Sequence, residues 1–218
     1  MKEKQTGHHR GNSTEPLLNK DIILNALDIL PGQIIVDVGC GNGYMAKEFS
    51  RLLNNTGKVY ALDRADEAIE QLKREAEGTN IVPIEADITQ RIALQDASID
   101  LIYLSTVFHI FSDGQRKNFQ NEVKRILKPK GRVAIVEIEK RETPFGPPQN
   151  MKVSPEELRQ FFKMQPASLL KVGEHFYMQL FENNTSDSFD FTPPQSPRKR
   201  GEAHMRHPFS HFPPFTGG

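Results

Sequence analysis

The sequence has 218 residues, enough for one domain with a sizeable hydrophobic core. Its 28 basic and 28 acidic residues cancel, so no overall positive field attracts nucleic acid, and we expect no nucleic-acid partner. The single cysteine, Cys40, excludes an internal disulfide, and no stretch approaches the ~20 apolar residues of a membrane helix. We expect a soluble, cytoplasmic protein without an integral membrane segment, and the sequence leaves its oligomeric state open.

The first half of the chain alternates between strand-like and helix-like segments. Apolar residues from Leu17 to Leu30 recur at helical spacing and predict an amphipathic helix, which Pro31 and Gly32 end. Further on, short runs rich in β-branched residues predict strands, and the amphipathic runs between them predict helices. The predicted strands cover residues 34–38, 58–63, 80–87 and 99–105, and the predicted helices cover residues 44–53 and 65–77.

The second half ends in a different arrangement. It predicts a helix over 114–127, a turn over 128–131, a strand over 132–139 and a helix over 154–163. The strand-like segments 167–172 and 175–182 lie too close together for a parallel crossover, which predicts an antiparallel pair. The fold class is therefore α/β: a Rossmann-like, doubly wound, mostly parallel seven-stranded sheet with a C-terminal antiparallel hairpin and helices on both faces. Its ligand site is expected at the carboxyl ends of the strands.

The two ends of the chain differ in composition from its centre. We predict a flexible N-terminal segment over residues 1–16, one domain over residues 17–182 and a disordered tail over residues 183–218. The tail has paired prolines and scattered phenylalanines without a period. The adjacent His8 and His9 have no further metal-ligand residues nearby, so we expect a solvated terminus and no metal site.

A glycine-rich turn follows the first predicted strand, and Asp37 precedes it. Read from Gly41 to Ala46, the turn satisfies a loose dinucleotide fingerprint, and Asp63 is placed to accept both hydroxyls of an adenosine ribose. The charge of Asp37 separates two classes of adenosyl ligand, because a carboxylate repels a pyrophosphate and attracts a cation. S-adenosylmethionine carries a sulfonium and an ammonium but no phosphate, so it fits the turn better than a nicotinamide dinucleotide does.

Five motifs follow one another between residues 20 and 182: VDVGCGNG, YALD, EADI, DLIYLSTVFHIF and RILKPKGRVAIVE. In this order they resemble the class I S-adenosylmethionine-dependent methyltransferases, in the small-molecule branch that includes the ubiquinone and menaquinone methyltransferases. The resemblance implies transfer of a methyl group from S-adenosylmethionine to an O, C or N atom of a small-molecule acceptor, with S-adenosylhomocysteine as the product. One departure is Lys130, where the family has the first glycine of a pair.

The resemblance also implies which residues hold the cofactor. In the family the glycine turn lies under the methionine portion, an acidic residue after the second strand holds the ribose, and an aspartate of the third motif meets the adenine. Carried over by position, the cofactor-binding residues are Asp37, Gly39, Cys40, Gly41, Gly43, Asp63, Arg64, Asp87, Ile88 and Ser105. Three of them also have a structural interpretation: Asp37 as a backbone anchor, Asp63 as a helix cap and Asp87 as a turn residue.

A general base is needed if the acceptor atom carries a proton, and it should lie beyond the fourth predicted strand. His109 is the candidate catalytic residue, because an unperturbed pKa of roughly 6.5 suits proton transfer at neutral pH. Its alternative role is packing among the apolar neighbours on either side of it. Phe145 and Met151, in the irregular segment 140–153, are candidates for contact with an apolar acceptor.

Two other functions stay open on the sequence. A non-catalytic adenosyl-ligand-binding protein would bind the cofactor without turnover, and an NAD(P)-dependent oxidoreductase would bind a dinucleotide. Methylation of base amino groups is disfavoured, because residues 105–108 do not contain the Pro-Pro-aromatic motif that such enzymes have after the fourth strand.

Overall fold

The structure is a computed structural model that describes residues 14–184. The predicted N-terminal segment and C-terminal tail lie almost entirely outside the described residues, as do His8 and His9. A short 3-10 helix, η1 (Glu15–Leu17), begins before the domain boundary predicted at residue 17. None of the helices formed by residues 14–184 is both long enough and apolar enough to cross a bilayer.

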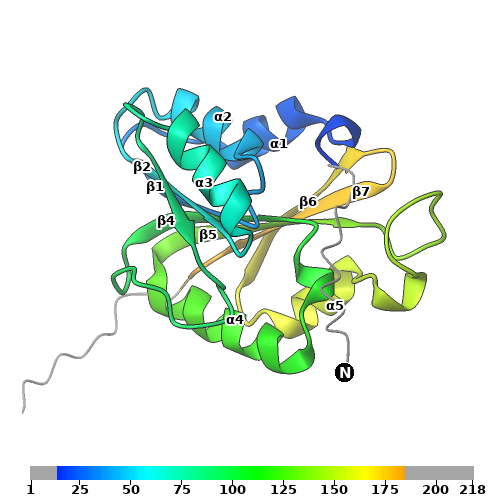
Figure 1. Cartoon of the computed structure of the whole chain (residues 1–218). Helices are drawn as coiled ribbons and strands as arrows, with labels where there is room; N and C mark the ends of the chain where they lie inside the picture. The colour runs from blue at the N-terminus through cyan, green and yellow to red at the C-terminus, as the bar shows by residue number, and fades with distance from the viewer. Residues whose placement is uncertain (1–13, 185–218) are drawn as a thin grey trace, which may run out of the picture. The chain divides into compact units, whose positions relative to one another are not determined.

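A seven-stranded sheet forms the centre of the described chain, with strand order β3-β2-β1-β4-β5-β7-β6 (Figure 1). The strands are β1 (Ile34–Val38), β2 (Lys58–Asp63), β3 (Ile81–Glu85), β4 (Ile99–Ser105), β5 (Leu127–Ile138), β6 (Gln165–Gly173) and β7 (Phe176–Glu182). All pairs among β1 to β5 are parallel, whereas β7 runs antiparallel to both β5 and β6. The predicted fold class, including the C-terminal hairpin, is confirmed.

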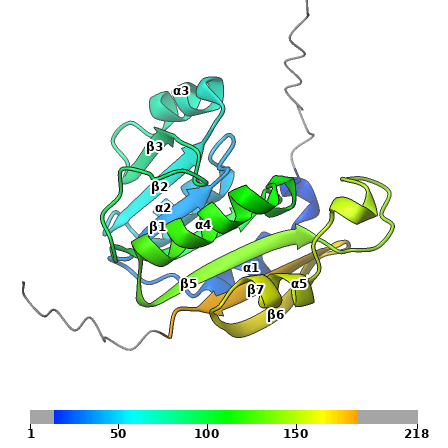
Figure 2. The same ribbon diagram turned by 90° about the horizontal axis from the view of Figure 1, so that it is seen from below.

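Helices cover both faces of this sheet. Helices α1 (Lys20–Leu27), α2 (Tyr44–Leu52) and α3 (Asp66–Glu75) lie on one face, and α4 (Asp113–Ile126) and α5 (Pro155–Phe161) lie on the other (Figures 1 and 2). The side chains of each strand point alternately to the two faces of the sheet. On β4, Leu101 and Tyr103 pack with α1 to α3, whereas Ile102 and Leu104 pack with α4 and α5. Two hydrophobic cores result, one on each side of the sheet.

The order of the strands reverses between β1 and β4. The chain moves outward from β1 through β2 to β3, then returns to place β4 on the other side of β1. In a doubly wound sheet, ligands bind in the crevice that such a reversal opens at the carboxyl ends of the strands. The glycine turn after β1 and the segment after β4 therefore meet at this crevice.

Two predicted elements differ from the structure. The helix predicted from Leu17 to Leu30 is divided into η1 and α1, and α1 begins after Asn19, whose side chain accepts a hydrogen bond from the N–H of Ile22. The turn predicted over residues 128–131 is wrong, because these residues form the first part of β5. Backbone hydrogen bonds hold them there: Lys130 N–H donates to Asn183 O, and Asn183 N–H donates to Gly131 O.

Candidate functional site

The glycine turn is folded tightly against β2 and the segment after β4. The N–H groups of Gly39 and Cys40 both donate to Leu62 O, at 2.8 and 3.0 Å. Gly39 has a φ of +70°, and a Cβ atom at this position would lie 2.5 Å from Cγ2 of Val107. Only glycine combines this conformation with such a close approach. The turn therefore brings backbone N–H and carbonyl groups to the crevice without intervening side chains.

Gly43 has a packing role in the same turn. It adopts a left-handed conformation at the N-cap of α2, and a Cβ atom there would lie 2.5 Å from Cδ1 of Leu72 on α3. This glycine lets α2 begin immediately after the turn while α3 packs against it.

A cavity of about 970 Å³ opens at the crevice, within the range of ligand-binding pockets. Four segments contribute to its walls: the glycine turn with the start of α2, the segment after β4, and two covering segments from Thr14 to Lys20 and from Phe145 to Pro147. The residues lining it are Thr14, Glu15, Pro16, Leu17, Leu18, Lys20, Ile23, Asp37, Gly39, Cys40, Gly41, Asn42, Tyr44, Met45, Tyr103, Ser105, Thr106, His109, Ile138, Phe145, Gly146 and Pro147.

Asp37 lies on the floor of this cavity and is only 3% exposed. Burial raises the pKa of its carboxyl to about 7; a hydrogen bond from the backbone of Ala46 opposes the increase, and the charges of Asp63 and Glu15 add to it. Its Oδ2 atom has no hydrogen-bond partner within the described part of the chain. A buried carboxylate oxygen facing a cavity suits a cationic ligand group and opposes a phosphate.

Asp63 connects the end of β2 to the glycine turn. Its Oδ2 accepts a hydrogen bond from Gly41 N–H and its Oδ1 accepts one from Ala65 N–H, both at 2.9 Å. Each carboxylate oxygen has a second lone pair, so these two bonds leave acceptor capacity for a ligand hydroxyl. The second bond orients the residue at the N-cap of α3, which is Ala65, so Asp63 itself is not the helix cap that its structural interpretation suggests.

Asp87 lies in the loop after β3 and faces Arg64. Asp87 Oδ1 accepts hydrogen bonds from the N–H and the hydroxyl of Thr89, and Oδ2 lies 3.7 Å from Nε of Arg64. Asp87 lines a second cavity of about 290 Å³. Ile88 is directed into the hydrophobic core and is only 3% exposed.

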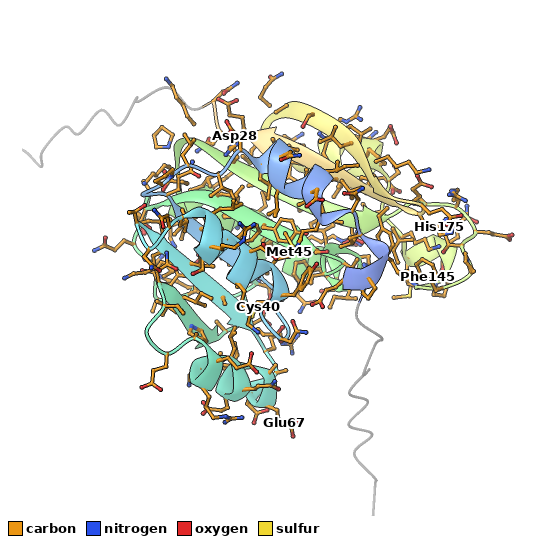
Figure 3. The ribbon with its side chains drawn as sticks, turned by 90° about the horizontal axis from the view of Figure 1, so that it is seen from above. Asp28, Cys40, Met45, Glu67, Phe145 and His175 are labelled. Atoms are coloured by element: carbon orange, nitrogen blue, oxygen red, sulfur yellow. The ribbon has the colours of Figure 1, made fainter. Side chains whose placement is uncertain are left out.

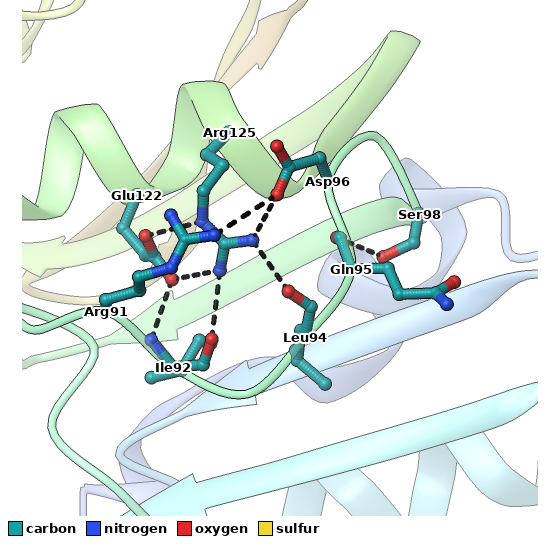
Figure 4. Close-up of polar contacts among 8 residues, drawn as sticks. All are labelled: Arg91, Ile92, Leu94, Gln95, Asp96, Ser98, Glu122 and Arg125. Atoms are coloured by element: carbon teal, nitrogen blue, oxygen red, sulfur yellow. Dashed lines mark hydrogen bonds and ion pairs between the residues drawn. The ribbon is translucent and has the colours of Figure 1, made fainter.

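A buried ion pair fastens this loop to α4 (Figure 4). Glu122 accepts a hydrogen bond from Ile92 N–H at 2.9 Å, and Arg125 donates to the carbonyl oxygens of Ile92 and Leu94 and to Asp96. Burial opposes ionisation of Glu122, but the hydrogen bonds from Arg125 and Ile92 outweigh it and lower the pKa of this carboxyl. The pair therefore fixes the loop that carries Asp87.

His109 forms a pair with Glu137, a buried carboxylate on β5 that is 1% exposed. The Nδ1 atom of His109 lies 2.7 Å from Glu137 Oε2, and the backbone N–H of His109 donates to Glu137 Oε1 at 3.2 Å. Because the carboxylate accepts the proton of Nδ1, the neutral imidazole keeps its lone pair on Nε2. His109 also lines the main cavity, and Glu137 fixes the orientation of its ring. His109 therefore has the contacts expected of a general base.

The covering segment after β5 supplies an aromatic wall. Phe145 lines the cavity, stacks on Phe176 with ring centroids 5.8 Å apart, and contacts the ring of His175 (Figure 3). Cys40 in the glycine turn and Met45 on α2 also line this cavity, and both are labelled in Figure 3. Met151 is 46% exposed and, unlike Phe145, does not line this cavity.

Comparison with known proteins identifies the domain. Residues 35–131 match the family described as the methyltransferase domain. A crystal structure of an S-adenosylmethionine-dependent methyltransferase from Aquifex aeolicus has the same fold, with a TM-score of 0.71 and 24% identity over 79% of this chain and 94% of that chain.

Residues 35–131 are therefore similar to the methyltransferase domain, and the described chain has the fold of a solved methyltransferase.

Two curated proteins that match part of this chain are named for the methylation of different small molecules. A probable cobalt-precorrin-6B C(15)-methyltransferase of Saccharolobus solfataricus is 32% identical over 87 residues, which are 38% of this chain and 44% of that protein. A ubiquinone/menaquinone biosynthesis C-methyltransferase of Laribacter hongkongensis is 24% identical over 129 residues, which are 59% of this chain and 52% of that protein. The chain spans about a third to a half of the length of the curated relatives it matches.

The methyltransferase domain brings some of the predicted site residues together and separates others. Asp37, Gly39, Cys40, Gly41, Ser105 and His109 line the main cavity. Asp87 lines the second cavity, and Gly43, Asp63, Arg64 and Ile88 line neither of the two. Within residues 14–184, no three His, Cys, Asp or Glu side chains gather as ligands for a metal ion.

Sequence reasoning missed two polar residues of the site, Tyr103 and Glu137. Each interrupts an otherwise apolar strand, IDLIYLS or VAIVEI, and a charged or hydroxyl-bearing side chain in a buried strand needs a partner or a ligand. That interruption is the signal that could have identified them.

Proposed function

We propose that the protein transfers a methyl group from S-adenosylmethionine to a small, largely apolar acceptor that loses a proton. The observation that carries this proposal is the cavity that is lined both by Asp37, whose Oδ2 has no hydrogen-bond partner within the described residues, and by His109, whose ring is held by Glu137 behind it. When bound, the cofactor supplies an electrophilic methyl group on a sulfonium, and the protein has to position an acceptor and remove its proton.

The proposed cofactor site runs along the carboxyl ends of β1, β2 and β3. Asp37 attracts the cationic methionine portion beside the glycine turn. The free lone pairs of Asp63 accept the ribose hydroxyls, and Asp87 and Arg64 flank the adenine. Arg64, after β2, lies 3.7 Å from Asp87, after β3, so the two side chains border the same edge of the sheet. Ile88 is buried in the core and supports this loop from below, without contact to the adenine.

The proposed acceptor site lies between His109 and the covering segments. Apolar groups from Leu17, Ile138, Phe145 and Pro147 line this part of the cavity, so it favours an acceptor with a hydrocarbon or aromatic surface. Nε2 of His109 takes the proton of the acceptor, and Glu137 holds the ring and stabilises its positive charge. Phenols, quinols and other hydroxyl-bearing rings are the acceptor class that meets both requirements.

Binding and turnover assays on ligand-free protein test this proposal against its alternatives. Calorimetric titration would compare S-adenosylmethionine, S-adenosylhomocysteine and the oxidised and reduced nicotinamide dinucleotides. Release of S-adenosylhomocysteine would then be followed with a panel of phenols, naphthols and quinols. Binding of the first two ligands with turnover supports a methyltransferase; binding without turnover across the panel favours a non-catalytic adenosyl-binding protein. Binding of a dinucleotide alone would contradict both.

The role of His109 predicts a particular pattern in variants. His109→Gln should lower turnover by about 10²-fold or more and leave the affinity for S-adenosylmethionine unchanged, because it removes the base and not the cofactor contacts. Glu137→Gln should also lower turnover, since it removes the carboxylate that orients the ring. An unaltered rate in His109→Gln with an accepted substrate would remove His109 from the mechanism and leave it a packing residue.

A further inference from the structure

Two buried polar atoms on the floor of the main cavity have no hydrogen-bond partner within residues 14–184. They are Oδ2 of Asp37 and the hydroxyl oxygen of Tyr103, a residue that is only 1% exposed. Buried polar groups in folded proteins almost always have a partner, so exceptions call for an explanation. Both residues line the same cavity, which points to a partner that enters it.

The two residues come from directly paired positions of neighbouring strands. Asp37 of β1 pairs with Tyr103 of β4 in the parallel ladder, where adjacent strands lie about 4.8 Å apart. Within residues 14–184, neither Asp37 Oδ2 nor the Tyr103 hydroxyl has a hydrogen-bond partner. Ser105, further along β4, is close enough to the hydroxyl to oppose in part the increase that burial causes in the pKa of Tyr103. The sheet thus presents an acceptor and a donor side by side to the cavity.

The ring of Tyr103 is held in place by packing. It makes an edge contact with Phe49 of α2, with ring centroids 5.3 Å apart and an angle of 77° between the planes. Burial also raises the pKa of the Tyr103 phenol above its ordinary value, so the hydroxyl keeps its proton. The Tyr103 hydroxyl is thus a hydrogen-bond donor held in a fixed position, and the Asp37 carboxylate beside it is a hydrogen-bond acceptor.

A ligand that satisfies both groups carries a cationic donor and an anionic acceptor on neighbouring atoms. The ammonium and carboxylate of an α-amino acid share one carbon atom and meet this requirement. We propose that Tyr103 donates a hydrogen bond to the α-carboxylate of the methyl donor while Asp37 accepts one from its α-ammonium. This assignment rests on the proposed function, and it makes Tyr103 a binding residue for the amino acid portion of S-adenosylmethionine.

Four adenosyl ligands that carry different parts of the amino acid test the two proposed hydrogen bonds separately. S-adenosylmethionine and S-adenosylhomocysteine carry the whole amino acid, decarboxylated S-adenosylmethionine lacks the carboxylate, and 5′-methylthioadenosine lacks the amino acid altogether. Calorimetric titration of Tyr103→Phe should show an affinity loss of about tenfold or more for the first two ligands, because a hydrogen bond to a charged group is removed. The affinities for the other two ligands should stay within about twofold of the wild-type values, because they lack the group that Tyr103 binds.

Asp37→Asn provides the complementary pattern. It should weaken decarboxylated S-adenosylmethionine as well as the two complete ligands, and leave 5′-methylthioadenosine unaffected. An equal loss for all four ligands in Tyr103→Phe, or no loss for any, would overturn the assignment of Tyr103 and leave cofactor binding by the domain intact. Failure of the wild-type protein to bind S-adenosylmethionine would overturn the proposed function itself.

Thermal denaturation separates a ligand contact from a structural one. Within the described part of the chain the Tyr103 hydroxyl has no hydrogen-bond partner, so ligand-free Tyr103→Phe should melt at or above the wild-type temperature. Tyr177→Phe is the matched control, because the buried Tyr177 hydroxyl donates to Val153 O at 2.6 Å; it should melt lower and bind all four ligands normally. A melting temperature of Tyr103→Phe that falls as far as that of Tyr177→Phe would show a structural partner and overturn the proposal.

Discussion

Thr106 has a backbone conformation that β-branched residues rarely adopt. Its φ is +55°, in the left-handed region, and its N–H donates to Val136 O at 2.8 Å. Such a conformation costs about 1–3 kcal/mol and persists where the surroundings enforce it. Thr106 lines the cavity, and its hydroxyl lies 3.5 Å from that of Thr14 in the covering segment. The strain is therefore located where a hydroxyl is presented to the site.

Relieving this strain should stabilise the protein and impair the site. We expect Thr106→Gly to raise the free energy of unfolding by about 1 kcal/mol, after allowance for the entropy of glycine in the unfolded chain, and to lower turnover. Urea denaturation and the methyl-transfer assay measure the two effects. Ala97→Gly is the matched control, because Ala97 has a φ of +47° and does not line the cavity; it should gain stability and keep full activity. Parallel behaviour of the two variants would contradict a functional role for Thr106.

Asp37 makes stability and ligand binding depend on pH in opposite directions. Its folded-state pKa of about 7 lies above the ordinary aspartate value of 3.8, so the folded state holds the proton more tightly than the unfolded state does. Stability is therefore lost as pH rises from about 4 to about 7, by up to about 4 kcal/mol in total. A cationic ligand prefers the ionised carboxylate, so affinity for S-adenosylmethionine should rise over the upper part of this range.

Asp37→Asn should remove both effects. At pH 8 we expect the ligand-free variant to be more stable than the wild type, and at pH 5 the difference should be much smaller. Urea denaturation at the two pH values measures this, and titration with S-adenosylmethionine should show weak binding that no longer increases with pH. Identical stability slopes in the variant and the wild type would show that Asp37 does not titrate between these values.

The loop after β3 and helix α4 act as one element because of the Glu122–Arg125 pair. Both side chains are largely buried, and Arg125 supplies partners for backbone carbonyls that the loop itself does not satisfy. Removing one member of a buried pair leaves the other charge without compensation, which costs more than the pair contributes.

We expect Arg125→Met to lower the free energy of unfolding by about 3 kcal/mol and to open the loop to limited proteolysis between Asp87 and Asp96. Adding Glu122→Gln should recover part of the loss, because the uncompensated carboxylate is removed. Arg91→Met is the matched control: Arg91 lies 3.8 Å from Asp96 on the surface, and its loss should change stability by less than about 0.5 kcal/mol. Equal losses in the two arginine variants would contradict a special role for the buried pair.

At the scale of the whole domain, the cavity is completed by segments that lie far apart in the sequence. Residues Thr14 to Leu18 form one wall, and this segment is attached to β6 by a bridge between Leu18 and Gly173 and by a 2.7 Å hydrogen bond from Asn19 N–H to Val172 O. Helix α1 packs separately through Ile23, Leu24 and Leu27. Most of the segment from Thr14 to Leu18 thus contributes to the wall, whereas α1 supplies buried core residues.

Deletion of residues 1–18 should leave the sheet folded and weaken ligand binding. Circular dichroism should show an unchanged fold, because the core contacts and N-cap of α1 remain, and calorimetric titration should show a reduced affinity for S-adenosylmethionine. Deletion of residues 1–13 is the matched control, since it keeps all the described residues that line the cavity. Equal affinity losses from the two deletions would contradict the role of the segment from Thr14 to Leu18.

The sequence predicts the order of strands and helices well because each segment has a clear period and ends at a glycine, a proline or a cap. It fails at residues 128–131, where the pairing partner Asn183 lies more than fifty residues away in the chain. The glycine turn is predictable because its residues are neighbours in sequence. Tyr103 and Glu137 are not, because only the register of the strands shows which groups they face.

The lone thiol of the chain lies in the wall of the cavity, 7% exposed, with burial and the nearby charges of Asp37 and Asp63 raising its pKa above the ordinary value. The Cys40 thiol is therefore protonated and largely shielded from solvent. A thiol reagent can react with it only when the glycine turn opens. Because the sequence has no other cysteine, the rate of modification of the unaltered protein follows the opening of one turn. Mass spectrometry of the labelled protein would therefore measure how often the glycine turn opens, without any substitution.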